Sequence, residues 1–277
     1  MRAGAIALLL LAGCAREIPA RPALYVLRDA DTTIWLFGTI HFLPKNVRWE
    51  TPAVTRAIDD SQALVGELPG GADVDASAEQ FARMSRASGL PPLVARVPAA
   101  ARAKLKQAVR ACGVPLDRVK SWAAALWLSG CGAATAGADA RAGVESVLAR
   151  RFAGRPRLGL ETLEGQLALF DRLDEADQRR LLIASLDSAQ EYRRLLTAWT
   201  SGDTARLGQL LAAPFADAPT LRAVLIDRRN IRWSRWIGAR MGQPGRLFLA
   251  VGAGHLAGPG SVIDRLRAAG YKVERVG

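Results

Sequence analysis

Strand-like runs of apolar residues stand toward both ends of the chain. They cover residues 23–27, 33–37, 63–68, 157–161, 245–251 and 271–276. Asp29-Ala30-Asp31 forms a turn signal between the first two runs, and this pattern predicts a β-hairpin. An isolated hairpin is a poor folding unit, so we expect strands from both chain ends to share one sheet.

Helix signals fill the middle of the chain. Thr51 and Pro52 predict the start of a helix that ends near Asp60, and Thr162 and Asp203 stand where side chains cap new helices. Three zones are predicted to be helical: residues 73–150, about 175–241 and about 259–269. The first zone is interrupted at residues 89–92, 113–115 and 129–143.

Together these signals predict an α/β (α+β) fold with a central mixed β-sheet built from both chain ends. We expect a large helical middle section to cover this sheet, including a helical cap at about residues 73–150. The uncharged stretch 122–138 is rich in Gly and Ala and too weakly hydrophobic for a membrane span, so it predicts a buried helix and a loop. No Ser-, Gly- or Pro-rich linker divides the chain, which predicts a single domain over residues 23–277.

The first residues have the form of an export signal. Arg2 precedes a short apolar run, and Leu11-Ala12-Gly13-Cys14 resembles a bacterial lipobox. We therefore expect residues 1–13 to be a lipoprotein signal peptide, Cys14 to carry the lipid, and residues 14–22 to be a tether. Residue 15 is Ala rather than Asp, which in such signals favours the outer membrane, here on its periplasmic side. The alternative is an ordinary signal peptide with a chance cysteine.

The net charge of +12 comes from 38 Lys and Arg against 26 Asp and Glu, and loss of residues 1–13 leaves +11. The basic residues, of which 33 are Arg, are scattered along the helices rather than concentrated on one element with interleaved aromatics. This distribution argues against a nucleic-acid partner and is typical of solvated helix faces. Cys112 and Cys131 lie in one helical region, and in an oxidising compartment they form either a disulfide or two buried free thiols.

The chain has two histidines, and both end a Gly-x-x-His motif behind an apolar strand. Gly38 precedes His41, and Gly252 precedes His255. If the two strands are neighbours, both imidazoles emerge at one sheet edge, where Glu67 also ends a strand. Two His and one carboxylate form a familiar catalytic metal set that activates water. The alternative is that each His is merely hydrogen-bonded and that Glu67 faces solvent.

Motifs along nearly the whole mature chain resemble the TraB/GumN family, which is related to the Tiki metalloproteases and more distantly to erythromycin esterase and ChaN-like proteins. The residues that carry the resemblance are Trp35-Leu36-Phe37-Gly38-Thr39-Ile40-His41 with Leu43-Pro44, Leu64-Val65-Gly66-Glu67, Lys120-Ser121-Trp122, Gly143-Val144-Glu145, Gly159-Leu160-Glu161-Thr162-Leu163-Glu164-Gly165-Gln166, Ala198-Trp199 with Gly202-Asp203, Arg229-Asn230 with Trp233, and Val251-Gly252-Ala253-Gly254-His255-Leu256. One departure is Leu68-Pro69 after Glu67, where relatives often place Asp or Asn.

The resemblance implies roles for particular residues. His41 and His255 match the motifs thought to hold a divalent metal (Mn, Co or Zn) in the Tiki branch, and Glu67 matches a ligand or general base. Glu145 and Glu161 match further family acids, and the pair Arg229-Asn230 implies an Arg that holds an oxyanion or a carboxylate. The alternatives are an exposed helix charge for Arg229 and a helix N-terminal charge for Glu161.

The expected function is therefore that of an exported lipoprotein that hydrolyses peptides or proteins with a divalent metal. A second hypothesis is a haem- or iron-binding envelope lipoprotein of the ChaN-like type, whose axial ligands come from the two His or from Tyr25, Tyr192 or Tyr271. A third is a catalytically silent accessory protein for surface polysaccharide or envelope assembly. The substrate and the oligomeric state stay open.

Overall fold

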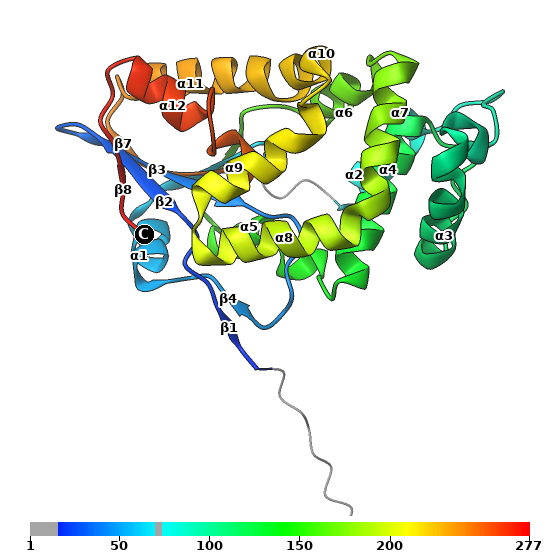
Figure 1. The fold of residues 1–277 in the computed structure, drawn as a ribbon. Helices are drawn as coiled ribbons and strands as arrows, with labels where there is room; N and C mark the ends of the chain where they lie inside the picture. The colour runs from blue at the N-terminus through cyan, green and yellow to red at the C-terminus, as the bar shows by residue number, and fades with distance from the viewer. Residues whose placement is uncertain (1–15, 70–73) are drawn as a thin grey trace, which may run out of the picture.

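Six strands form the main sheet of the protein, in the order β6-β5-β7-β3-β2-β8. Figure 1 labels four of them, β2, β3, β7 and β8, which lie together at one end of the molecule. The computed structural model describes residues 16–69 and 74–277, so the predicted signal peptide 1–13 and Cys14 lie outside the described residues. The strands are β2 (Leu24–Arg28), β3 (Thr32–Thr39), β5 (Ala63–Gly66), β6 (Arg157–Gly159), β7 (Gly245–Gly252) and β8 (Val273–Arg275). β2 is antiparallel to β3 and β8, while β3, β7, β5 and β6 pair in parallel, which confirms a mixed sheet that joins both chain ends.

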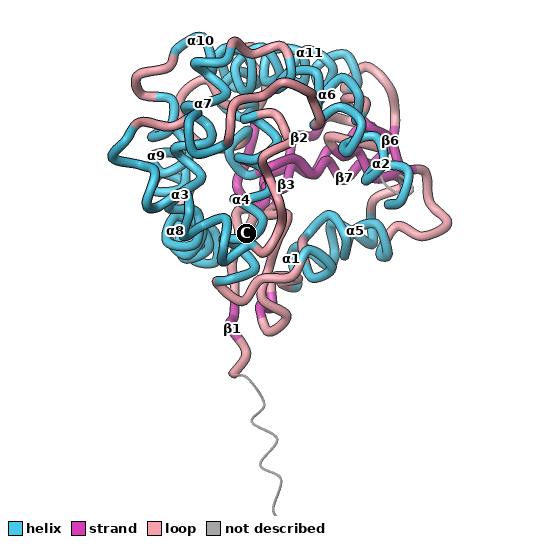
Figure 2. The backbone as a smooth tube through the Cα atoms, turned by 90° about the vertical axis from the view of Figure 1, so that its right-hand side faces the viewer, coloured by secondary structure: helices cyan, strands magenta, loops and turns pink. Residues whose placement is uncertain are grey.

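Alternating side chains divide this sheet between two apolar layers. Phe37 and Phe248 face a cluster that includes Trp199, whereas Leu36 and Leu249 face a cluster with Trp233. Figure 2 shows the strands between α11 on one side and α1 and α5 on the other. The buried strands read as near-continuous apolar runs because helices cover both faces.

The helices begin where the sequence signals place them. Thr51 caps α1 with its hydroxyl, and Thr162 and Asp203 cap α6 and α9 in the same way. The helices are α1 (Pro52–Asp60), α2 (Val74–Ser85), α3 (Arg102–Cys112), α4 (Ser121–Thr135), α5 (Val144–Arg151), α6 (Leu163–Asp171), α7 (Glu175–Ala184), α8 (Ser188–Ser201), α9 (Thr204–Ala212), α10 (Pro219–Arg222), α11 (Arg228–Arg240) and α12 (Val262–Ala268). Within the described ranges, no helix combines the length and the apolar character needed to cross a membrane.

The helical cap has other borders than the predicted 73–150. Its core joins α2, α3 and α4 to α6 and α7, with Trp122, Leu167 and Leu182 buried together. In contrast, α5 packs on the sheet through Val144 and Leu148. The difference arises because contacts between helices distant in sequence, which no local signal shows, decide which helices form the cap.

The predicted tether 14–22 also proves shorter. Ile18-Pro19 forms the strand β1 and pairs in parallel with β4 (Val47–Arg48), and Ala20 is 3% exposed. The Arg21 N–H donates to the Thr200 carbonyl at 2.7 Å. Residues 18–21 therefore belong to the domain, because their backbone groups bond to it.

Cys112 at the end of α3 and Cys131 in α4 form a disulfide. Of the two alternatives left open by the sequence, the structure thus has the cross-link rather than two free thiols. The two residues are 19 positions apart, and the bond fastens α3 to the core of the cap.

Replacement of both cysteines by Ala is expected to lower the free energy of unfolding by about 3 kcal/mol, because a loop of this length gains that much entropy in the unfolded chain when the bond is absent. Urea unfolding of the wild type and of the C112A/C131A variant measures the difference. Dithiothreitol should bring the wild type to the variant's value and leave the variant unchanged. A wild type that is insensitive to reductant would contradict the cross-link.

Candidate functional site

The two Gly-x-x-His motifs follow neighbouring strands. β3 and β7 pair in parallel with Gly38 opposite Val251 and Thr39 opposite Gly252, so His41 and His255 leave the same sheet edge. This confirms that the two strands are neighbours. Gly38 is needed for this approach, because a Cβ there would lie 3.0 Å from the Ala253 Cα.

The next two strands place two carboxylates beside these motifs. β5 pairs with β7 on one side and with β6 on the other. The pairing continues past the strand ends, where the Glu161 N–H donates to the Glu67 carbonyl at 2.8 Å. Glu67 and Glu161 therefore stand side by side, with side chains 14% and 7% exposed.

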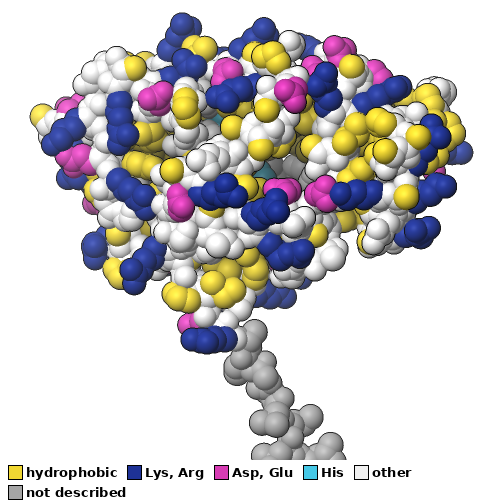
Figure 3. Space-filling model, in the orientation of Figure 1, with side chains coloured by type: hydrophobic (Ala, Val, Ile, Leu, Met, Phe, Trp, Pro, Cys, Tyr) yellow, Lys and Arg dark blue, Asp and Glu magenta, His cyan; other side chains and the backbone are white. Residues whose placement is uncertain are grey.

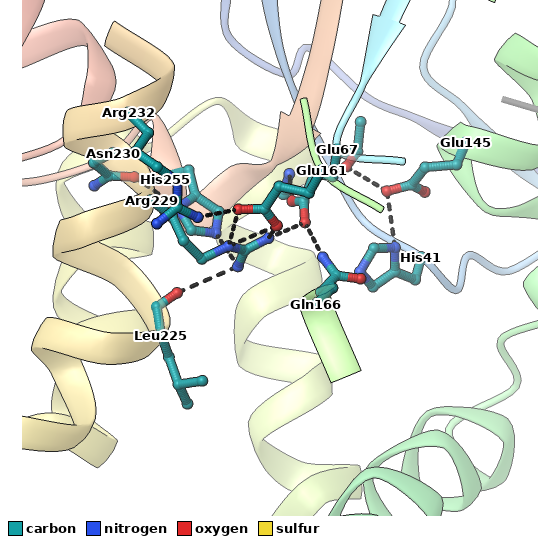
Figure 4. A network of polar contacts seen from close by, with 12 residues as sticks. His41, Glu67, Glu145, Glu161, Gln166, Leu225, Arg229, Asn230, Arg232 and His255 are labelled. Carbon is teal, nitrogen blue, oxygen red and sulfur yellow. Dashed lines mark hydrogen bonds and ion pairs between the residues drawn. The ribbon is translucent and has the colours of Figure 1, made fainter. Parts of the chain in front are cut away.

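Arg229 of α11 lies between these carboxylates (Figure 4). Its Nη2 lies 2.6 Å from Glu67 Oε2 and 2.9 Å from Glu161 Oε2, and its Nε donates to both Glu161 oxygens at 3.1 Å. Its Nη1 lies 3.2 Å from the Leu225 carbonyl oxygen and 3.0 Å from His255 Nε2. We call Arg229, Glu67, Glu161, His255 and the Leu225 carbonyl the arginine cluster.

This geometry changes the role predicted for Arg229. A guanidinium has five N–H groups, and each of them already faces an acceptor of the cluster. The carboxylate role is met within the protein by Glu67 and Glu161, while no N–H group of Arg229 is left in this arrangement for an oxyanion. The alternatives of an exposed helix charge and a lone helix N-terminal charge fail, since Arg229 is 6% exposed and Glu161 pairs with Arg229 and Arg232.

The cluster keeps Glu67 charged. Burial alone raises the pKa of the Glu67 carboxyl, but Arg229, the two histidines and the hydrogen bond from the Gly252 N–H together outweigh this effect, and the pKa falls to about 2. Oε2 accepts from Arg229 and, at 2.7 Å, from the Gln166 amide, while Oε1 accepts from the Gly252 N–H at 2.7 Å. Oε1 therefore has a further lone pair to offer.

His255 is the buried histidine of the site, at 5% exposed. Its Nδ1 lies 2.7 Å from Asn230 Oδ1, and its ring packs on Trp233 with centroids 4.5 Å apart. Burial lowers the pKa of His255 to about 4, and the charge of Arg229 acts in the same direction. The imidazole is thus neutral at pH 7.

His41 is the exposed histidine of the site. Its side chain is 68% exposed, and its Nδ1 lies 2.8 Å from Glu145 Oε1, which also accepts from the Thr39 hydroxyl. The negative charge of Glu145 raises the pKa of His41 to about 9, although burial opposes it, and in turn the His41 charge lowers the pKa of Glu145 against its burial. Water screens part of this attraction, because the His41 ring is largely exposed.

Gly143 explains how Glu145 reaches His41. A Cβ on Gly143 would overlap the His41 carbonyl oxygen, so only glycine lets the start of α5 approach this loop. The Val144 N–H then donates to the Ile40 carbonyl at 3.1 Å. The Gly143-Val144-Glu145 motif therefore serves to build the His41–Glu145 pair.

The predicted metal set was tested against these contacts. A metal needs the lone pair of His255 Nε2, yet the positively charged Arg229 donates to that nitrogen, and Glu67 already accepts from Arg229, Gln166 and Gly252. Among residues 16–69 and 74–277, no three His, Cys, Asp or Glu gather in a way that could hold an ion. The residues as arranged do not fit a metal held by His41, Glu67 and His255, and we derive no step through one.

The residues named for haem are in part engaged elsewhere. The Tyr192 hydroxyl donates to the Phe42 carbonyl, the Tyr271 hydroxyl lies 3.3 Å from the Gly238 carbonyl, and Tyr25 is buried in the core. Since both ring nitrogens of His255 are bonded, His41 Nε2 is the open ring nitrogen of the two histidines. The haem hypothesis and the accessory-protein hypothesis stay predictions.

Three residues of the site had no role assigned from the sequence. Thr39 bonds to Glu145, Gln166 bonds to Glu67, and Arg232 pairs with Glu161 at 2.8 Å. Thr39 and Gln166 lie inside the motifs quoted above, and Arg232 lies three positions after Arg229, on the same helix face. In the space-filling view, histidine shows in a hollow bordered by basic and acidic side chains (Figure 3).

Comparisons with known proteins agree with the motif assignments. A sequence model of the TraB/PrgY/gumN family matches residues 23–275. The chain is also similar to a protein of Escherichia coli (strain K12) described as uncharacterized protein YbaP, with 25% identity over 262 residues that cover 89% of this chain and 92% of YbaP. No solved structure matches.

Replacement of Arg229 by Gln is expected to lower the free energy of unfolding at pH 7 by about 3–5 kcal/mol, because two buried carboxylates lose their shared cation. Urea unfolding measures the loss. The matched control is Arg228→Gln, an exposed neighbour on the same helix, which should change the value by no more than about 0.5 kcal/mol.

The pH dependence gives a second readout. The pKa of Glu67 is lowered from 4.5 to about 2. Its contribution to the free energy of unfolding is therefore fully present above pH 4.5 and is lost as the pH falls toward 2. The difference in the free energy of unfolding between wild type and R229Q should therefore be largest above pH 4.5 and become smaller on acidification. A gap that stays constant down to the acid transition would contradict the charge pairing.

Proposed function

The chain belongs to the TraB/PrgY/gumN family, and on that basis we propose that it is an exported hydrolase that cleaves peptide bonds by acid–base catalysis. The observation that carries the proposal is the His41–Glu145 pair next to Glu67. Glu145 holds Nδ1 of the largely exposed His41, its Nε2 has no hydrogen-bond partner among the described residues, and Glu67 has a further lone pair on Oε1. Figure 4 draws the Gln166 side chain between the two groups.

The two groups have complementary protonation states at neutral pH. Glu67 is a carboxylate with its pKa lowered to about 2, and His41 is an imidazolium with its pKa raised toward 9. The charge of each group also shifts the pKa of the other toward its charged form. Acid and base assignments of this kind follow from environments that push two pKa values apart.

In the proposed reaction, Glu67 Oε1 accepts a hydrogen bond from a water molecule whose oxygen attacks the peptide carbonyl carbon. The water proton passes to the carboxylate only transiently, because its low pKa makes it a weak base. His41 Nε2–H donates its proton to the leaving amine nitrogen as the C–N bond breaks. The Glu67 proton then returns to His41 through solvent, so that one water is consumed for each peptide bond.

An apolar groove of about 1880 Å³ supports a polypeptide substrate. Phe42, the residue after His41, lines it together with Phe81, Leu126 and Trp127. The groove is larger than the pockets that hold drug-sized molecules, at roughly 300–1,000 Å³. Because Phe42 directly follows His41 in the chain, the groove favours a peptide whose apolar side chains lie in it while one peptide bond reaches the His41–Glu145 pair.

The proposal includes the cell envelope as the place of action. Export with a lipid at Cys14, on the periplasmic side of the outer membrane, rests on the sequence signal. The Cys112–Cys131 disulfide supports an oxidising compartment, because cytosolic thiols are kept reduced.

A peptide-library screen should find a peptide that the protein cleaves. The pH–rate profile of that cleavage then tests the acid role of His41. The rate should stay level through neutral pH and fall toward pH 9, because His41 loses its proton there. In Glu145→Gln the carboxylate no longer raises the pKa of His41, so the alkaline limb should move down toward pH 6.5.

Glu164→Gln, which removes an exposed acid of the first turn of α6, is the matched control and should leave the profile in place. His41→Gln and Glu67→Gln should each lower the rate by about 10²–10⁴-fold. A rate that climbs from pH 7 to 9, as for a neutral histidine base, would overturn the assignment of acid and base.

A further inference from the structure

His255 is held on both sides of its ring. Its Nδ1 faces Asn230 Oδ1 at 2.7 Å, and its Nε2 faces Arg229 Nη1 at 3.0 Å. The residue is 5% exposed, so water does not compete for either nitrogen. These two partners determine which nitrogen carries the proton.

The proton position follows from the chain of donors and acceptors. The Asn230 amide nitrogen donates to the Gly260 carbonyl at 3.0 Å, which orients the amide and turns Oδ1 toward His255. Oδ1 only accepts, so Nδ1 must carry the proton. The guanidinium of Arg229 only donates, so Nε2 must offer its lone pair.

We propose that His255 is a positioning residue, a neutral acceptor locked in its Nδ1–H tautomer by Asn230 and Gly260, whose Nε2 holds the guanidinium of Arg229. The Trp233 ring contacts both groups: the Arg229 guanidinium lies 4.6 Å from its centre, and the His255 ring packs on it. The second Gly-x-x-His motif thus orients an arginine and binds no metal.

A neutral acceptor suits this position for an electrostatic reason. The two negative charges of Glu67 and Glu161 are already balanced by the two positive charges of Arg229 and Arg232. A third carboxylate would leave an uncompensated buried negative charge, and an imidazolium would place two cations in contact. The unprotonated nitrogen of an imidazole satisfies the N–H of Arg229 without adding a charge.

The inference rests on the proposed function in one respect: the purpose of the arrangement. By fixing Nη1, His255 turns Nη2 of the same planar group toward Glu67 Oε2. Arg229 then keeps Glu67 ionised with Oε1 free for water. His255 acts on Glu67 through Arg229 and does not touch the substrate.

Nitrogen-15 NMR of the full chain tests this directly, because the protein has only two histidines and His41→Gln assigns the remaining ring. At pH 7 the His255 nitrogens should show the pattern of a neutral ring protonated at Nδ1. Addition of equimolar Zn²⁺ should leave both His255 signals in place. An Nε2–H pattern, an imidazolium pattern or a Zn²⁺-induced shift of His255 Nε2 would overturn the proposal, and this wild-type result needs no folded variant.

Because Arg229 alone still requires the Nε2 lone pair, the double variant Arg229→Gln with Asn230→Ala is needed to remove both partners that fix the tautomer, and a signal of the Nε2–H form should then appear. The matched control is Asn46→Ala, the other asparagine of the chain, whose amide bonds to the Arg16 carbonyl at the surface. An unchanged Nδ1–H pattern in a folded R229Q/N230A variant would contradict the role of these two partners. The His41 signals in the same spectra test the hydrolase separately, since a His41 pKa near 6.5 would contradict the acid role and leave the tautomer result intact.

Discussion

The site depends on one buried cation shared by two carboxylates. Arg229 comes from α11, Glu67 from the end of β5 and Glu161 from the end of β6, so a single guanidinium joins the helix layer to two neighbouring strands. Each of the three side chains would be costly to bury alone, and each is tolerable because the others are present. The same contacts keep Glu67 ionised and hold the guanidinium that His255 Nε2 contacts.

The two Gly-x-x-His motifs are alike in sequence and differ in their surroundings. His41 is exposed and pairs with a carboxylate, which favours its charged form, whereas His255 is buried beside an arginine, which favours its neutral form. In the proposed reaction the first motif supplies the proton donor, and the second motif positions Arg229. Burial and the nearest charge, rather than the motif, determine which task a histidine can perform.

Local signals were enough to predict much of the fold and part of the site. The β2–β3 hairpin, strand β7 and the Thr51-capped helix α1 follow from apolar runs, turn residues and caps that lie within a few positions of each other. The shared Gly-x-x-His motif raised a common site only on the condition that the strands before His41 and His255 are neighbours, and the structure meets that condition. The saturation of Arg229, its contact with His255 and the joining of α6 and α7 to the cap were not, because they rest on pairings between distant segments. Sequence alone also could not distinguish buried Arg229 from its exposed neighbour Arg228.

The most direct test of the shared cation is the free energy of unfolding of the triple variant R229Q/E67Q/E161Q compared with R229Q. If the loss in R229Q comes from two uncompensated carboxylates, their neutralisation should restore more than half of it, since residues in one network are not additive. A triple variant less stable than R229Q, with the three losses simply adding, would contradict the account.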